Sequence, residues 1–340
     1  MSQHYINQWT AAEFEKHLKE FADADQAITK IEIAGDGNMN FTLRLKFADG
    51  SSIIAKQSPP FCARFPDIPA PEDRIFSEIR YYQLLEKDAF LTEHSPALLG
   101  MDHENNIAYI SDLGQATDFE YLYAQDKKLD QVTCEKLLGY LVKLHSLEIP
   151  PSLEFKNLEM RNLNHEYIFD LPFREGERAI DLDKITDGLA EVADNILSDQ
   201  SLRKAAKELG QLYYENASTL IHGDYYPMSW IKTEKGLFII DPEFGFLGLP
   251  EIDIGFFLAH MLLSDNFKIA YNTVLKQYDS FDEMLVTKFC AVEVIRRITY
   301  VSQLPIINNL SFKSQLLAAS AEALKTGKME VYEIFNHNNN

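Results

Sequence analysis

The chain has 340 residues, which is too many for one small hydrophobic core and enough for two lobes. Hydrophobic residues make up 46% and charged residues 25%, which is ordinary for a folded protein and excludes a fibrous or largely disordered chain. The formal net charge is −20, so the summed field repels nucleic acid and the anionic faces of membranes. We therefore predict a two-lobed protein with neither nucleic acid nor a membrane as a partner, and we attribute the acidity to solubility.

Cysteine usage and hydropathy indicate where the protein resides. Cys62, Cys134 and Cys290 are widely spaced, and neither they nor the histidines show zinc-ligand spacing. No segment approaches the run of about 18 apolar residues that a membrane helix needs, and the N-terminal residues are polar and amphipathic. We expect reduced thiols and a cytoplasmic, unanchored protein.

The first third of the chain has a β-rich pattern. Apolar and polar residues alternate on both sides of the turn at 35–37, which is typical of antiparallel strands, and Thr10 can cap a helix before them. The proline-rich residues 59–73 are predicted to form a loop, because proline does not sustain a helix. The expected elements are a helix at 10–22, strands at 27–34, 40–47, 51–57 and 106–111, and a helix at 72–88.

Turn residues at 112–118 place the boundary between the lobes after residue 113, so the predicted domains are residues 1–113 and 114–340. The second domain is mainly helical by the period of its apolar residues. Helices are expected at 133–147, 183–197, 201–217, 252–264, 281–304 and 311–328, with a short β segment near 231–241. The expected fold class is α+β, with an antiparallel β-rich N-lobe that carries a helix and a mainly helical C-lobe.

The segments HGDYYPMSW (222–230) and DPEFG (241–245) flank a predicted hairpin. The two ends of a hairpin lie close together, so the carboxylates of Asp224 and Asp241 can reach one small volume. One carboxylate can orient and deprotonate an attacking hydroxyl while the other holds Mg²⁺, which prefers oxygen ligands and retains substrate phosphates. Asp224 suits the first role and Asp241 the second, with Ser229 and Glu243 as further oxygen ligands. Considered alone, each segment also fits an Asx turn or a surface hairpin.

The N-lobe carries groups that suit a triphosphate. Lys56 is flanked by apolar residues in IIAKQ, so we expect it in a half-buried cleft, where its ammonium group requires an anion such as Glu78 or the phosphates of ATP. The turn GDGNMN can present backbone N–H groups to phosphate oxygens through Gly35, Asp36, Gly37, Asn38 and Asn40.

Each of these N-lobe features also has an ordinary structural explanation. The turn fits a simple hairpin, Lys56 a solvated strand position, and Glu78 a solvated helix face. A glycine turn, a strand lysine, a helix glutamate, His-Gly-Asp and Asp-Pro-Glu in that order are harder to obtain by chance. The combination therefore favours a site for ATP and Mg²⁺.

In wording and order these motifs resemble the aminoglycoside-phosphotransferase-like branch of the protein kinase fold, and within it the methylthioribose kinases. The stretches that carry the resemblance span nearly the whole chain: GDGNMNFTLRL, AKQSPPFCAR, EDRIFSE, LIHGDYYPMSWI, DPEFGFLGLPEIDIG and EVIRRITYVSQL. The resemblance implies a two-lobed protein-kinase-like fold, with ATP binding by the N-lobe and the catalytic loop, metal and acceptor in the C-lobe. It also implies a place in methionine salvage.

The resemblance further implies a role for each motif residue. Asp224 is implied to be the catalytic base, or the group that orients the hydroxyl, and Asp241 the principal Mg²⁺ ligand. Lys56 and Glu78 are implied to position the phosphates. The hinge whose backbone receives adenine is implied to be Ile110, Ser111, Asp112 and Leu113.

Two positions favour the methylthioribose kinases within the wider family, and three positions differ from the residues that the family commonly has. Much of the wider family has a metal-binding asparagine where this chain and the methylthioribose kinases have serine, here Ser229, and Glu243 replaces the glycine of protein kinases. The family commonly has Leu-His and a glycine where this chain has Tyr225, Tyr226 and Met228, so we expect an altered acceptor pocket. The chain is also shorter than methylthioribose kinases usually are.

Three arginines are candidates for substrate contacts. The resemblance suggests that Arg296 or Arg297 binds a sugar acceptor, and a structural ion pair with a nearby acid is the alternative. Arg64, which follows the proline pair, can lean over the γ-phosphate or cap the loop in solvent.

The histidines are expected to be structural rather than catalytic. His222 is predicted to hydrogen-bond backbone groups and to fix the loop that carries Asp224. His145 ends a predicted helix, and His260 lies among apolar residues as a satisfied core histidine.

Together these features predict transfer of the ATP γ-phosphoryl group to a hydroxyl of a small sugar or polyol, with S-methyl-5-thioribose as the first acceptor to test. A related phosphotransferase acting on an aminoglycoside, choline or another small alcohol is an alternative, which the net charge keeps open because acidic pockets favour cations. A second alternative is a catalytically silent nucleotide-binding module, which the bulky residues after Asp224 would explain. The sequence leaves the oligomeric state open, a homodimer included.

Overall fold

The computed structural model describes residues 4–35, 37–124, 126–176, 179–215, 217–301, 303–306 and 309–336. The chain forms two compact units, which we call the first and second units. The first comprises Met1–Thr117, Asn157–Met160 and Ile231–Gly245, and the second comprises Asp118–Lys156, Arg161–Trp230 and Phe246–Asn340. These units differ from the predicted lobes, because the segment that carries Asp241 joins the first unit, where the Ile239 amide donates to the carbonyl oxygen of His94 at 2.9 Å.

The first unit is built on a five-stranded antiparallel sheet in the order β1-β2-β3-β7-β6. Side chains alternate between the two faces of a strand, and this alternation in β2 buries Leu43, Leu45 and Phe47 on one face. The strands are β1 (Ile28–Ile33), β2 (Phe41–Phe47), β3 (Ser52–Gln57), β6 (Leu98–Asp102) and β7 (Ile107–Ser111). The predicted strands of the N-lobe are therefore confirmed, and β6 was not predicted.

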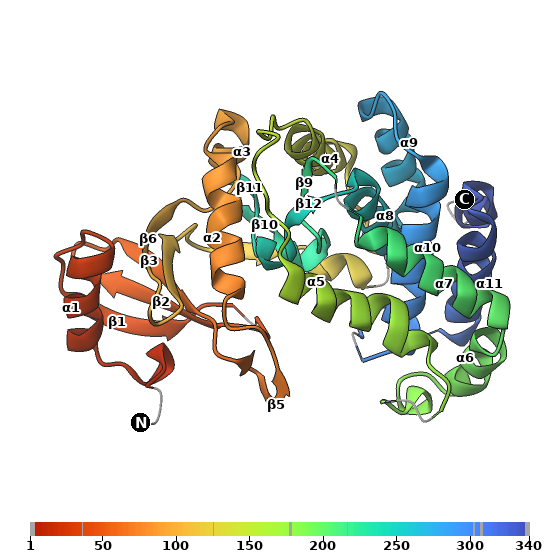
Figure 1. The fold of residues 1–340 in the computed structure, drawn as a ribbon, viewed down its shortest axis with the longest axis horizontal. Helices are drawn as coiled ribbons and strands as arrows, with labels where there is room; N and C mark the ends of the chain where they lie inside the picture. Colours follow the sequence, from red (N-terminus) through yellow and green to blue (C-terminus); the bar gives the residue numbers. More distant parts are fainter. Residues whose placement is uncertain are drawn as a thin grey trace. The chain divides into compact units, whose positions relative to one another are not determined.

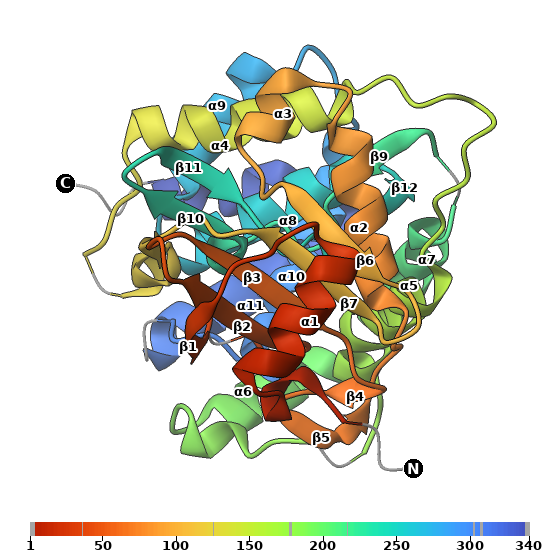
Figure 2. The ribbon, with the colours of Figure 1, turned by 90° about the vertical axis from the view of Figure 1, so that its left-hand side faces the viewer.

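One helix covers each face of this sheet. Helix α1 (Ala11–Phe21) packs Phe14 and Leu18 against the face that carries Leu45, and α2 (Arg74–Leu85) packs Ile75 and Ile79 against the other face. Figure 1 shows the two helices on opposite sides of the sheet, and Figure 2 shows α1 in front of it. Side chains on the α2 face of the sheet therefore meet α2.

Local signals determine where α1 begins and fail in the proline-rich segment. The Thr10 hydroxyl accepts from the Glu13 amide, and the Glu13 carboxylate accepts from the Thr10 amide, which is a capping box. The prediction of a loop at 59–73 was wrong in part, because β4 (Phe61–Cys62) and β5 (Phe65–Pro69) pair there. Proline is tolerated in β5 because the strand is exposed at a sheet edge, where the N–H group that proline lacks is not required for a bond to a further strand.

The remaining elements attached to the first unit are short. They are α3 (Ala89–Glu93), β8 (Ala116–Asp118), β10 (Trp230–Thr233) and β11 (Gly236–Ile239), with single turns at Ile6–Gln8 and Pro242–Phe244. Strands β10 and β11 pair as the predicted hairpin, with β8 beside β10.

The second unit is mainly helical, as predicted. Helix α10 packs against α8 and α11, and it lies between them in Figure 1. The short strands β9 (Thr219–Ile221) and β12 (Phe246–Gly248) pair antiparallel. The helices that belong wholly or partly to this unit are α4 (Gln131–His145), α5 (Leu158–His165), α6 (Leu189–Leu197), α7 (Gln200–Tyr213), α8 (Pro250–Leu263), α9 (Phe267–Gln277), α10 (Glu283–Thr299) and α11 (Leu310–Thr326).

Short 3₁₀- or π-helical segments complete this unit at Glu120–Tyr123, Glu166–Asp170, Leu171–Phe173, Leu182–Lys184, Pro227–Ser229 and Met329–Asn336. In the ranges that the structure describes, every helix is too short or too polar to traverse a bilayer.

We predict that Gly100→Ala separates α1 from the sheet. A methyl group at Gly100 in β6 would overlap the carbonyl oxygen of Phe21 and lie 2.8 Å from Cα of Ala22, at the end of α1. Overpacking of this kind lowers the free energy of unfolding by about 1–3 kcal/mol. The measurement is urea unfolding followed by circular dichroism.

Gly139→Ala is the matched control, because Gly139 lies within α4 and a methyl group there meets no atom within 4 Å. Alanine in a helix interior should raise the free energy of unfolding by about 0.5–1 kcal/mol. Equal effects of the two substitutions would contradict the packing argument.

Candidate active site

Lys56 lies on the α2 face of the sheet because of its register in β3. Lys56 pairs with Ala108 of β7, and Ala108 packs against Ile75 and Ile79. Glu78 lies on α2 three residues after Ile75 and next to Ile79, so the same face of the helix presents its carboxylate to Lys56. The pleat of the sheet and the period of the helix together bring the two charges to one buried point.

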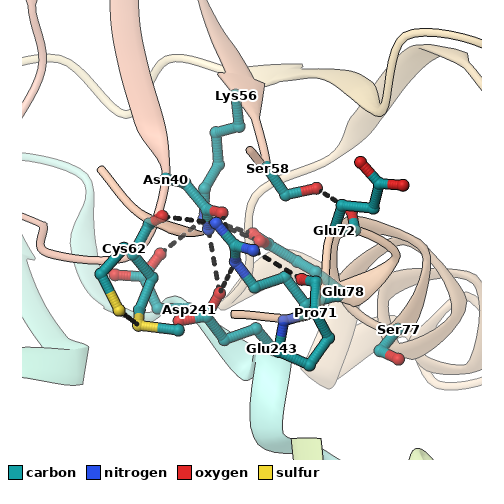
Figure 3. A network of polar contacts seen from close by, with 12 residues as sticks. Asn40, Lys56, Ser58, Cys62, Pro71, Glu72, Ser77, Glu78, Asp241 and Glu243 are labelled. Carbon is teal, nitrogen blue, oxygen red and sulfur yellow. Dashed lines mark hydrogen bonds and ion pairs between the residues drawn. The ribbon is translucent and has the colours of Figure 1, made fainter. Parts of the chain in front are cut away.

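The ammonium group of Lys56 is held by two carboxylates, as Figure 3 shows. Its Nζ donates to both oxygens of Glu78 at 2.7 Å and to Oδ1 of Asp241 at 2.7 Å. Burial lowers the pKa of Lys56, but the charges of Asp241 and Glu78 outweigh burial and leave that pKa above its usual value. Burial also raises the pKa of Glu78, against Lys56, which lowers it. The expected pair of Lys56 with Glu78 is thus present, and Asp241 joins it.

Asp241 differs from its two neighbours in its exposure. Its side chain is 50% exposed, whereas those of Lys56 and Glu78 are 5% and 2% exposed. Its backbone is left-handed, with φ of 58°, a conformation that only a few residue types other than glycine adopt readily, Asp among them. The carboxylate therefore holds Lys56 with one oxygen and remains partly accessible.

Glu243 lies deeper than Asp241 and contacts other groups. Its Oε2 accepts from Nδ2 of Asn40 at 2.9 Å and forms an ion pair with Arg74 at 3.8 Å (Figure 3 labels Asn40 and Glu243). Burial raises the pKa of Glu243 to about 7, against Lys56 and Arg74, which lower it. In this arrangement Glu243 links the glycine turn to the segment after β11, and its role as a metal ligand remains a prediction.

Arg74 is a residue that the sequence analysis did not single out. It is completely buried at the start of α2, and burial lowers its pKa. Its Nε donates to the side chain of Asn40 at 2.9 Å. Its other nitrogens donate to the carbonyl oxygens of Met39, Pro59, Phe61 and Pro71. Arg74 therefore ties the proline-rich hairpin and the glycine turn to α2, and the stretch EDRIFSE was the available signal.

The glycine turn and Arg64 lie next to each other. Gly35 has φ of 75°, which glycine adopts without strain, and Asp36 lies outside the described residues. The Arg64 amide donates to the carbonyl oxygen of Asn38 at 3.0 Å, and its exposed guanidinium reaches the side chain of Asn38 at 3.4 Å. The β4–β5 hairpin thus places Arg64 beside the turn, while contact of either with phosphate remains a prediction.

The predicted hinge residues begin in β7. Ile110 and Ser111 pair with Ile54 and Ile53 of β3, and the Ser111 amide donates to the carbonyl oxygen of Ala97 at 2.8 Å.

The Asp112 carboxylate is engaged by neighbouring groups. It accepts from Nε of Arg44 at 2.6 Å, from the Ser52 hydroxyl at 2.6 Å and from the Gly114 amide at 2.9 Å. The Asp112 side chain is therefore occupied, and contact of the hinge backbone with adenine remains a prediction.

In the second unit, the loop that carries Asp224 is anchored by Asp253 of α8. The completely buried Asp253 carboxylate accepts from the amides of His222 at 2.7 Å and Gly223 at 2.9 Å, and it lies 3.1 Å from Nε2 of His145. The Asp224 amide donates to Nδ1 of His222 at 3.4 Å, as expected of a histidine that fixes this loop. The sequence analysis did not single out Asp253, although it lies in the stretch DPEFGFLGLPEIDIG.

Two arginines of α10 lie beside the Asp224 carboxylate. Nη2 of Arg296 and Nη2 of Arg297 lie 3.9 and 3.6 Å from Oδ1 of Asp224, and both arginines are also bonded to Glu293. The Asp224 side chain is 22% exposed. Burial raises its pKa above the usual value, against the guanidinium groups of Arg297 and Arg296. The structural ion pair, one of the two alternatives for these arginines, is thus present, and their contact with a sugar acceptor remains a prediction.

The two tyrosines that follow Asp224 have different environments. Tyr225 is completely buried, and its hydroxyl donates to the carbonyl oxygen of Leu137 at 2.8 Å, so it belongs to the core and does not reshape an acceptor pocket. Tyr226 is half-buried and lies against the Arg297 guanidinium, 4.9 Å from its ring centre. Tyr226 and Met228, which is also half-buried, remain the candidates for the expected change in the acceptor pocket. The Ser229 hydroxyl donates to the carbonyl oxygen of Asp224 at 3.0 Å.

The chemistry of Asp241 fits a magnesium ion. Among the described residues, no three His, Cys, Asp or Glu side chains are grouped so that they could hold a metal. Mg²⁺ is usually bound by one or two carboxylates together with substrate phosphates, so a complete protein cage is not required. The half-exposed carboxylate of Asp241, next to the lysine expected to meet the phosphates, meets this requirement.

The sequence pattern that defines the phosphotransferase enzyme family matches residues 48–286. The chain belongs to the phosphotransferase enzyme family. Among curated relatives, methylthioribose kinase of Erwinia tasmaniensis is 27% identical over 273 residues, which cover 75% of this chain and 66% of the relative. Methylthioribose kinase of Yersinia pseudotuberculosis is 28% identical over 266 residues, which cover 75% and 63%. The matched region thus spans slightly less than two thirds of these relatives, and the predicted family membership is confirmed.

Solved phosphotransferase and kinase structures share the fold. Spectinomycin phosphotransferase, solved with ADP and spectinomycin, aligns over 94% of this chain and 98% of its own, with a TM-score of 0.55 and 13% identity. LicA, the choline kinase of Streptococcus pneumoniae, was also solved with AMP, and that structure aligns over 94% of this chain and 99% of its own, with a TM-score of 0.52 and 14% identity. At these identities the likeness concerns the fold, and the predicted two-lobed kinase-like α+β fold is confirmed.

We predict that Asp253→Asn destabilises the loop that carries Asp224. Asparagine keeps one acceptor oxygen where two buried amides now donate, so one amide loses its partner. An unsatisfied buried group lowers the free energy of unfolding by about 1–3 kcal/mol. Asp130→Asn, at the N-cap of α4, is the control and should be nearly neutral, because asparagine caps as well as aspartate. Equal urea midpoints for the two variants would refute the anchoring role.

We also predict a pH dependence of stability from His260 of α8. Burial lowers the pKa of His260 to about 4, whereas histidine in an unfolded chain titrates near about 6.5. At a pH between these two values, His260 is protonated in the unfolded state but not in the folded state. The free energy of unfolding therefore falls as the pH falls. Between pH 7 and pH 5 the wild type should therefore lose about 2 kcal/mol more than His260→Gln in urea unfolding. The exposed His103→Gln is the control, and a wild-type slope in His260→Gln would contradict this prediction.

Proposed function

We propose that this chain is an ATP-dependent kinase that phosphorylates a hydroxyl of a small, uncharged sugar, with S-methyl-5-thioribose as the first candidate acceptor. The observation that carries the proposal is the environment of Asp224, which lies beside the guanidinium groups of Arg296 and Arg297. A carboxylate that can accept a proton and two forked N–H donors suit an acceptor with several hydroxyl groups.

The local charge balance argues against a cationic acceptor. The two arginines are opposed by two carboxylates, Asp224 and Glu293, so the cluster has no excess negative charge to attract an amine. At an effective dielectric constant of about 20, a cation about 4 Å from one guanidinium is repelled by about 4 kcal/mol, which offsets its attraction to Asp224 at the same distance. The cluster therefore gives a cation no net attraction, which favours a neutral sugar over choline or an aminoglycoside despite the net charge of −20.

Asp224 would orient the acceptor hydroxyl and take up its proton as the new bond to phosphorus forms. The two guanidinium groups would bind neighbouring oxygens of the acceptor and so align the hydroxyl. Catalysis in this family of reactions depends mainly on alignment and charge neutralisation. The anchoring of the loop by Asp253 supports this role, because it restricts the movement of Asp224.

In the first unit, Lys56 would bind the phosphates of ATP, with Glu78 holding its ammonium group. The glycine turn and the backbone after β7 would receive the phosphates and adenine, respectively. Asp241, together with Ser229 and Glu243 as predicted further ligands, would hold Mg²⁺. When bound, Mg²⁺ neutralises charge on the phosphate oxygens.

The curated relatives support the choice of acceptor. Their names state methylthioribose kinase, and the matched region covers 66% and 63% of the first two. A place in methionine salvage and a cytoplasmic location follow from the same proposal. A homodimer stays a prediction.

The test is a panel of acceptors with purified protein, ATP and Mg²⁺, monitored by ADP release. We expect turnover with S-methyl-5-thioribose and none above background with choline or spectinomycin. Turnover of an amine without turnover of methylthioribose would refute the proposed acceptor, and nucleotide binding with no turnover of any acceptor would favour the silent module.

Asp224→Asn serves as the catalytic control for this panel. Removing a general base should lower kcat by a factor of about 10²–10⁴ while leaving nucleotide binding unchanged. Asp282→Asn is its matched control, because Asp282 caps α10 and asparagine caps equally well. It should retain wild-type turnover.

A further inference from the structure

Glu293 connects both arginines of the acceptor site and was not singled out by the sequence analysis. It is completely buried in α10, and Arg296 and Arg297 follow it by three and four residues on the same helix face. Its Oε1 accepts from Nη2 of Arg296 at 2.9 Å and from Nε of Arg297 at 2.7 Å, and its Oε2 accepts from Nε of Arg296. One carboxylate therefore bonds both guanidinium groups.

A fourth donor reaches Glu293 from α8. Nε2 of the completely buried His260 lies 3.1 Å from Oε1 of Glu293, and Nδ1 lies 2.6 Å from the hydroxyl of Tyr123. Glu293 can only accept when ionised, so the neutral imidazole donates through Nε2 and accepts the Tyr123 hydroxyl at Nδ1. The histidine that the sequence indicated as a satisfied core residue thus carries a hydrogen-bond chain to the acceptor site.

These contacts leave Glu293 no capacity for chemistry of its own. Burial raises its pKa, but Arg296 and Arg297 outweigh burial and hold that pKa well below its usual range. Its carboxylate accepts from Arg296 twice, from Arg297 and from His260, and an ionised carboxylate offers about four lone-pair sites. Glu293 is thus an anion that four N–H donors hold in place.

Tyr226 restricts Arg297 from another direction. Its ring centre lies 4.9 Å from the Arg297 guanidinium carbon and 5.2 Å from the centre of the His260 ring. The guanidinium of Arg297 is therefore bonded to Glu293 at Nε, covered by an aromatic ring, and 3.6 Å from Asp224 at Nη2. Its orientation is set before any acceptor arrives.

We propose that Glu293 is a positioning residue that fixes the two guanidinium groups beside Asp224, so that acceptor binding depends on a carboxylate that does not touch the acceptor. The inference rests on the proposed function of this site. Buried ion pairs contribute little net stability compared with apolar packing, and their best-attested use is to specify one arrangement. We therefore assign the buried carboxylate of Glu293 a role in specifying the arrangement of the two arginines, rather than in adding stability.

The test uses Glu293→Gln and the conservative Glu293→Asp with S-methyl-5-thioribose as acceptor. Glu293→Gln should raise the acceptor KM at least tenfold and change the ATP KM by less than twofold. Glu293→Asp should recover part of the loss, because it keeps the charge. Glu135→Gln is the matched control, since Glu135 pairs with Lys276 in the same unit and lies outside the site.

A double-mutant cycle separates positioning from a merely structural role. If Glu293 acts through the arginines, Arg297→Lys should raise the acceptor KM far less in the Glu293→Gln background than in the wild type. In the control pair, Arg297→Lys should raise the acceptor KM by the same factor in the Glu135→Gln background as in the wild type. A fall in active fraction, titrated by nucleotide binding, with an unchanged acceptor KM would overturn the proposal.

A second measurement needs no acceptor and so remains decisive if methylthioribose proves inactive. Nε–H protons of buried, bonded arginines exchange slowly with water, and they can be followed by NMR of arginine-labelled, ligand-free protein. We expect two slowly exchanging signals, which are assigned by their loss in Arg296→Lys and Arg297→Lys. Both protons should exchange at least tenfold faster in Glu293→Gln. In Glu135→Gln they should exchange at the wild-type rate. Unchanged exchange in Glu293→Gln would overturn the positioning role independently of the acceptor.

Tyr123→Phe covers the case in which Glu293→Gln does not fold. It removes one hydroxyl from the outer end of the chain that holds His260 against Glu293. We expect a two- to fivefold rise in the acceptor KM and faster exchange of the Arg297 signal. No change in either quantity would contradict the hydrogen-bond chain.

Discussion

The buried ammonium group of Lys56 is the constraint on which the first unit depends. A charge removed from water is tolerated only when it is paired, so the fold must bring carboxylates to it. Glu78 arrives from α2 and Asp241 from the segment after β11, each 2.7 Å from Nζ. A strand, a helix and a distant loop are therefore tied to one atom. The half-exposed Asp241 is the one member of this trio that also faces outward, which makes it the natural contact for a metal–phosphate ligand.

The second unit pairs its buried cations with carboxylates in the same way. Two guanidinium groups of α10 lie between the buried anion Glu293 and the partly exposed anion Asp224. In each unit a fully buried carboxylate and a more accessible one hold the cations. In the proposed function, the buried carboxylate maintains the geometry and the accessible one meets the ligand.

Patterns within a few residues predicted structure well, and patterns that need distant partners did not. Thr10 marked the start of α1, and alternation marked β1 to β3, because both signals depend on neighbouring positions. The proline-rich segment was taken for a loop, since an edge hairpin with no outer partner has no local signature. Tyr225 looked like a pocket residue next to Asp224, yet its ring enters the core, which only the packing of α4 decides.

The sequence by itself determined the order and types of the reactive groups, the local elements that carry them, and the spacing that sets Glu293 one helical turn before its arginines. Only the tertiary structure decided which of these groups meet. Lys56 and Asp241 are separated by 185 positions. Arg74 bonds the glycine turn and the proline-rich hairpin, and Asp253 bonds the backbone before Asp224. The physical reason is that short-range geometry follows from backbone and side-chain preferences, whereas pairing of buried charges depends on the register in which whole segments pack.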